Sequence, residues 1–166
     1  MSAIDNLDLD PIKVKLMDTH DGESWSFEKV EAICIKYRRF LTLNLENPKA
    51  AIVPTQDIDT FWHYHILDTI KYAEDCTQCF GYFLHHFPYF GLRGAEDAKN
   101  LADAFEATKA LYEARFGERL ASEEAEAAET DCKVGCGQVA CKIGNCKSNS
   151  TSGIRPKLLH SAASLQ

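Results

Sequence analysis

Residues 57–76 read Asp57-Ile-Asp-Thr-Phe-Trp-His-Tyr-His-Ile-Leu-Asp-Thr-Ile-Lys-Tyr-Ala-Glu-Asp-Cys76. Large apolar side chains recur in this stretch at intervals of three and four residues, which places them along one face of an α-helix. Thr55 or Asp57 has the side chain of a helix N-cap. Gly81 can interrupt or end the helix, because glycine readily adopts the left-handed conformation found at helix C-termini. The pattern predicts a helix from Thr55 or Asp57 towards Cys79.

Two further helices are predicted on either side of this stretch. Upstream, Ser24 or Ser26 can cap a helix. Its apolar stripe is Phe27, Val30, Ile33, Cys34, Tyr37, Phe40 and Leu41. Downstream, Asp97 begins a final helix for which Gly117 is the expected C-cap. Its stripe is Leu101, Ala104, Phe105, Thr108, Leu111, Tyr112 and Phe116. Residues 82–86 are expected to form a short turn. We therefore expect an all-α, compact bundle of four or five helices with a flexible Cys-rich C-terminal tail.

Charge and cysteine content divide the chain of 166 residues into parts. The net charge of -7 combines an acidic body with a basic end, because residues 131–166 contain five basic side chains and one acidic one. We predict a helical domain over residues 1–118 and an acidic helical extension or linker over residues 119–130. The basic, Cys-rich tail over residues 131–166 has almost no aromatic side chains, so we expect it to be disordered without metal or modification.

Composition argues against several classes of protein. No apolar run approaches the roughly 20 residues that cross a bilayer, and the acidic N-terminus does not resemble a secretory signal. We expect no membrane association, a cytoplasmic location and reduced thiols. Nucleic acid is not an expected partner, because binding phosphates requires clustered lysine and arginine. Nucleophile-elbow, phosphate-loop and dinucleotide motifs are missing, so the sequence assigns no enzyme class.

A candidate metal pocket lies in the central stretch, where four of the six histidines fall between residues 63 and 86. The expected ligands or orienting groups are His63, His65, His85, Asp59, Asp75 and Cys76. Such side chains bind zinc or iron, with an open position for hydrolytic or redox chemistry if the protein is an enzyme. On a regular helix His63 and His65 lie on nearly opposite sides, whereas Asp59 and His63 share one side. The alternative is a non-enzymatic interaction or scaffold module in which Trp62, His65 and Tyr72 pack as hydrogen-bonded core residues.

The tail is a second candidate site. Cys132-Lys-Val-Gly-Cys136 is echoed by Cys141-Lys-Ile-Gly-Asn-Cys146. Four thiolates at these spacings can hold zinc or an iron–sulfur cluster, although the usual two-residue spacing is missing. Free thiols, a substrate for a modifying enzyme, and recruitment of a protein partner remain open. The Cys76-x-x-Cys79 pair has redox or zinc spacing but lacks the strand-to-helix context of a thioredoxin-like site.

Several short motifs follow one another along residues 25–118. They are Ile52-Val53-Pro54, Asp57-Ile58-Asp59, Trp62-His63-Tyr64-His65, Tyr72, Asp75-Cys76, Gly81, His85 and Leu111-Tyr112-Glu-Ala-Arg-Phe116-Gly117-Glu118. This order resembles the first domain of plant glycine-rich domain-containing proteins and of short bacterial relatives, a family without a settled biochemical function. The resemblance implies no particular activity. The glycine-rich and RNA-binding regions of the plant members have no counterpart here, so the resemblance does not imply nucleic-acid binding.

Overall fold

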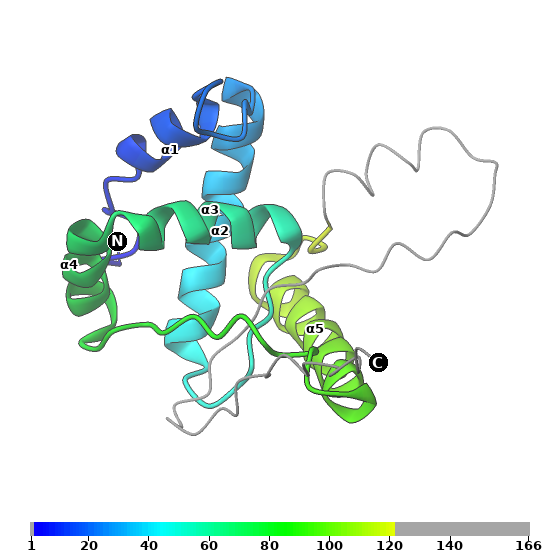
Figure 1. Ribbon diagram of the computed structural model, residues 1–166. Coiled ribbons are helices and arrows are strands. Elements are labelled where there is room, and N and C mark those ends of the chain that lie inside the picture. Colours follow the sequence, from blue (N-terminus) through cyan, green and yellow to red (C-terminus); the bar gives the residue numbers. More distant parts are fainter. Residues whose placement is uncertain (1, 122–166) are drawn as a thin grey trace, which may run out of the picture.

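The computed structural model describes residues 2–121, which contain five helices and no strand. The helices are α1 (Asp10–Met17), α2 (Phe27–Glu46), α3 (Gln56–Leu67), α4 (Thr69–Phe80) and α5 (Ala95–Phe116). The predicted all-α class is therefore confirmed. Helix α2 packs against α1, α3 and α5, and Figure 1 shows α3 crossing it. The predicted Cys-rich tail, residues 131–166, lies outside the described part of the chain.

Helix α2 forms as its apolar stripe predicts. The Ser26 hydroxyl accepts a hydrogen bond from the Lys29 amide at 3.2 Å, which caps the first turn. The predicted stripe faces the core except at its first residue, Phe27, which is exposed because it lies in the first turn of the helix. The buried residues of α2 are Val30, Ile33, Cys34, Tyr37, Phe40 and Leu41 from the stripe, and also Leu43 and Asn44. Asn47 and the following proline end the helix. In the segment between α2 and α3, the buried Val53 amide donates to Thr108 Oγ1 at 2.9 Å. This hydrogen bond attaches the segment to α5.

The predicted single helix from Thr55 towards Cys79 is in fact two helices. The chain leaves the helical conformation at Asp68, whose φ and ψ are −80° and 75°. The Asp68 carboxylate then accepts from the Lys71 amide and caps α4. A continuous apolar pattern can hide such a break, because an aspartate is tolerated both inside a helix and as a cap. The break turns α4 away from the axis of α3 (Figure 1).

One further helix and one helix start differ from expectation. Helix α1 was not predicted, because its eight residues bury only Ile12 and Leu16 and give too short a pattern to detect. Helix α5 begins at Ala95 rather than at Asp97. The Asp97 carboxylate instead accepts from the amides of Gly91 and Arg93, at 2.6 and 3.2 Å, and orders the preceding loop.

Glycine ends two helices as predicted. Gly81 has φ 70° and Gly117 has φ 71°, both in the left-handed region. Their amides donate to Thr77 and Glu113 respectively, which closes α4 and α5. Among residues 2–121, no helix combines the length and the apolar character that a membrane span requires.

Candidate metal centre

Helix α3 supplies two side chains to one face. Thr55 caps the helix, with its hydroxyl accepting from the Ile58 amide at 3.5 Å. This start places Asp59 in the first turn and His63 one turn later, so that both project from the same side. The Asp59 side chain is 3% exposed, whereas that of His63 is 48% exposed. The pair thus has a buried carboxylate and an imidazole that faces solvent.

The third side chain comes from the segment that follows α4. Figure 1 shows this segment running back below α3 towards α5. It brings His86 against α3, where the His86 ring packs edge-on against the Trp62 ring with centroids 4.7 Å apart. The His86 side chain is 10% exposed. Its position is therefore fixed by packing on α3.

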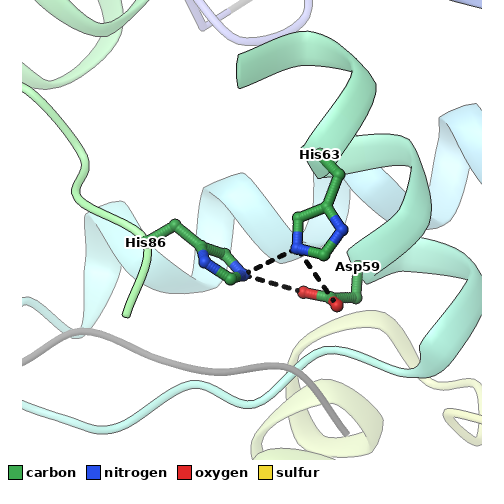
Figure 2. A group of neighbouring side chains, drawn as sticks. All are labelled: Asp59, His63 and His86. Carbon is green, nitrogen blue, oxygen red and sulfur yellow. Dashed lines mark hydrogen bonds and ion pairs between the residues drawn. The ribbon is translucent and has the colours of Figure 1, made fainter. Parts of the chain in front are cut away.

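The donor atoms of the three side chains converge on one point, as Figure 2 shows. His63 Nε2 lies 3.1 Å from His86 Nε2. The two oxygens of Asp59 complete the triangle, with Oδ1 3.1 Å from His86 Nε2 and Oδ2 3.4 Å from His63 Nε2. Two ligands of a tetrahedral zinc ion lie about 3.3–3.4 Å apart, and ligands at right angles about 3.0 Å apart. Each of the three observed spacings falls close to this range, and one donor atom from each residue lies within 4.8 Å of the other two.

Hydrogen bonds alone cannot satisfy all three contacts. Each neutral imidazole carries at most one proton at Nε2, and the carboxylate of Asp59 can only accept. If both rings donate to Asp59, two N–H groups face each other across 3.1 Å. If His63 donates to His86 instead, the lone pair of His86 accepts and His86 Nε2 has no proton for Asp59. A cation between the three atoms would pair all of them at once.

The electrostatics of the cluster favour neutral imidazole. Partial burial lowers the pKa of the His63 ring, an effect that the Asp59 carboxylate opposes and His86 reinforces. A lowered pKa keeps the ring uncharged near neutral pH, and the uncharged ring is the form that binds metal.

His65 and Asp75 lie together in a different place. His65 is 1% exposed, and its Nε2 lies 2.9 Å from Asp75 Oδ2 while its Nδ1 lies 2.8 Å from the Tyr37 hydroxyl. The Asp75 carboxylate also accepts from Lys71 Nζ at 2.9 Å. Burial lowers the pKa of His65, against the pull of Asp75. This buried network joins α2, α3 and α4.

The structure separates His85 and Cys76 from the cluster. His85 is exposed, and its ring contacts that of Phe83 with centroids 4.9 Å apart. Cys76 is buried, and its sulfur accepts from the Leu84 amide at 3.5 Å. The histidine expected in the pocket was His85, whereas the structure places its neighbour His86 in the cluster. Alternation in an extended segment could have identified it, because residues 84 and 86 then share a side opposite to residue 85.

The Cys76-x-x-Cys79 pair has the environment of core residues. The described cysteines, Cys34, Cys76 and Cys79, form no disulfide within residues 2–121, and all three are buried. Burial raises the pKa of the Cys79 thiol to about 11, so the reactive thiolate is scarce at neutral pH. The four tail cysteines, Cys132, Cys136, Cys141 and Cys146, lie outside the described residues.

Comparisons with known proteins agree with the resemblance seen in the sequence. A family model described as UCP032817-like matches residues 2–111. Glycine-rich domain-containing proteins 2 and 1 of Arabidopsis thaliana are 38% and 34% identical over 88 residues. The match covers 51% of this chain but 11% and 10% of those relatives, so the chain spans about a tenth of their length. No solved structure matches the chain. The predicted similarity to glycine-rich domain-containing proteins is confirmed.

Proposed function

This chain belongs to the UCP032817-like family, and we propose that it binds one transition-metal ion through Asp59, His63 and His86. The close approach of the donor atoms carries the proposal: the two imidazole nitrogens lie 3.1 Å apart, and each lies 3.1–3.4 Å from one of the two Asp59 oxygens. The hydrogen-bonding pattern of the same contacts adds support, because a cation would pair with the lone pairs of both rings and with the carboxylate at once.

The chemistry of the donors favours zinc or ferrous iron. Imidazole suits both metals, and two histidines with one carboxylate form a ligand set used by open zinc sites and by non-haem iron sites. Structural zinc sites usually have four protein ligands, whereas sites that react with substrates keep a position open. The half-exposed His63 leaves solvent access beside the cluster. A bound ion would thus retain a position for water or a small ligand, as hydrolytic or redox chemistry requires.

The first experiment measures metal in the full chain purified without a histidine tag. Its background is the tail-serine protein, defined as the full chain with the four tail cysteines replaced by serine. The replaced residues are Cys132, Cys136, Cys141 and Cys146. Elemental analysis should find about one zinc or iron per tail-serine chain, because three protein ligands suffice for one ion. His63→Ala and His86→Ala should each remove it. The proposal would be contradicted if the tail-serine protein folded without metal, or if the variant carrying both His63→Ala and His86→Ala retained the metal.

His85→Ala is the matched control for His86→Ala. The two substitutions remove the same side chain from adjacent positions, but His85 is exposed and lies outside the cluster. We expect the His85 variant to bind metal as the parent does. Equal loss of metal in both variants would instead indicate an effect on the loop as a whole.

A non-enzymatic scaffold or interaction module is the second candidate. The observation in its favour is His65, which is buried between Tyr37 and Asp75 and thus serves packing. In that case the tail-serine protein would fold without metal. The His63→Ala and His86→Ala variants would then lower the stability of the protein and would not change its metal content. The tail would then bind zinc or an iron–sulfur cluster, or a protein partner. Comparing metal content of the native chain and the tail-serine protein measures the tail's share directly.

A further inference from the structure

Leu84 anchors the segment that carries His86 to α4. Its side chain is 0% exposed, and both of its main-chain polar groups are bound by α4. Its amide donates to Cys76 Sγ at 3.5 Å, and its carbonyl accepts from the Tyr72 hydroxyl at 2.5 Å. Since Leu84 lies two residues before His86, these bonds fix where the His86 backbone can lie.

The same Tyr72 hydroxyl is bound to α3. It accepts from Trp62 Nε1 at 2.9 Å, and Trp62 directly precedes His63. The Trp62 ring in turn packs edge-on against the His86 ring, with an angle of 70° between the planes. A single hydroxyl thus links the helix that carries Asp59 and His63 with the segment that carries His86.

We infer that Tyr72 is a positioning residue of the metal centre, one that holds His86 within reach of Asp59 and His63; this inference rests on the proposed metal site. Tyr72 touches none of the three donor atoms directly, so its effect passes through Leu84 and Trp62. Burial raises the pKa of the Tyr72 hydroxyl. The group therefore keeps its proton and donates to Leu84 throughout the neutral range.

Removing the hydroxyl should release the segment while leaving the core filled. Tyr72→Phe keeps the buried ring, which packs edge-on against the rings of His65 and Phe83. It leaves the Leu84 carbonyl and the Trp62 indole without the bonds they now make. A buried polar group without a hydrogen-bond partner is destabilising, and contact with water removes that cost. The loss of the two bonds therefore favours opening of the segment around Leu84. His86 would then sample positions away from the other two donors.

Tyr112→Phe is the matched control. Tyr112 is also buried, at 2% exposure, and its hydroxyl accepts one hydrogen bond, from Arg39 Nη1 at 3.1 Å. It lies on α5, and its hydroxyl bonds neither Leu84 nor Trp62. Both variants thus lose one buried hydroxyl. Only the hydroxyl of Tyr72 makes hydrogen bonds that link α3 with the segment carrying His86.

The experiment compares the two variants in the tail-serine protein, with zinc as the probe. Zinc affinity is measured by competition with a chelator, and amide hydrogen exchange of residues 82–86 is measured without metal. Tyr72→Phe should weaken zinc binding about tenfold, the lower end of the effect of losing a supporting hydrogen bond. It should also speed exchange at residues 82–86. Tyr112→Phe should change neither quantity.

The two measurements separate this inference from the proposed function. If the parent binds no zinc, the proposed metal site is wrong and with it the effect on affinity. If the parent binds zinc and Tyr72→Phe leaves affinity unchanged, Tyr72 is not a positioning residue and the metal site stands. Unchanged exchange at residues 82–86 would also overturn the role of Tyr72. Should Tyr72→Phe fail to fold, Cys76→Ala removes the other bond to Leu84 and should weaken zinc binding in the same way.

Discussion

His63 and His65 lie two residues apart on α3 and face opposite environments. His63 Nε2 lies 3.1 Å from His86 at the solvent-facing cluster, whereas His65 Nε2 lies 2.9 Å from Asp75 inside the molecule. Helical geometry enforces this separation, because neighbours two positions apart point to nearly opposite sides. One short histidine motif therefore contributes to two places, the proposed metal site on one side and the packed interior on the other.

Zinc should stabilise the folded protein through the cluster. A ligand that binds the native state alone adds about 2.7 kcal/mol when its free concentration is about 100 times Kd. We expect zinc to raise the melting temperature of the tail-serine protein, and a chelator to reverse the change. His86→Ala should abolish the response, and His85→Ala should keep it. An equal response in all three proteins would place zinc binding elsewhere.

Replacing His65 should destabilise the core without removing the cluster. His65→Ala leaves a cavity, and it leaves the Tyr37 hydroxyl and the Asp75 carboxylate without their common partner. We expect a loss of about 3 kcal/mol in the free energy of unfolding, measured by urea denaturation. Zinc should still bind to the folded fraction. A loss below about 1 kcal/mol would show that His65 is a minor contributor to the core.

Stability should fall as the solution is acidified below neutral pH. Burial lowers the folded-state pKa of both His63 and His65. Above the unfolded histidine pKa of about 6.5, both states hold neutral rings and the full stability is present. Between that value and the lower folded pKa, the unfolded state binds more protons, so stability is lost as pH falls. Urea titrations of the metal-free protein at a series of pH values should show this slope. His65→Gln should reduce it, and a slope unchanged by that variant would assign the effect to other groups.

The three body cysteines should resist thiol reagents. Cys34, Cys76 and Cys79 are buried, and burial raises the pKa of Cys34 as well as that of Cys79. In the tail-serine protein we expect negligible labelling near neutral pH until a denaturant is added, because the thiolate is the reacting form. Mass spectrometry counts the labels. Rapid labelling of Cys76 or Cys79, or a disulfide between them after mild oxidation, would restore the redox interpretation of this pair.

Local patterns in the sequence were sufficient for much of the helical framework. The stripe of α2, a serine cap at Ser24 or Ser26, and the glycines after α4 and α5 all follow from side-chain spacing and backbone preference, which act within one or two turns. The same reasoning placed Asp59 and His63 on one face, because that placement depends on nothing beyond helix geometry. The family resemblance likewise rested on motifs visible in order along the chain.

Tertiary structure decided the features that depend on distant partners. The break at Asp68 turns α4, and this turn lets Asp75 reach His65 from ten residues away. The choice of His86 over His85 depends on how the segment after α4 is anchored at Leu84. Such hydrogen bonds join residues on different elements, and no periodicity along the chain encodes them. The sequence by itself determined α2, α5, the helical character of residues 56–80 and the histidine and aspartate donor types of the candidate metal centre. The packing of α4 and its following segment on α3 decided which three side chains meet, because convergence in space depends on the path of the backbone between them.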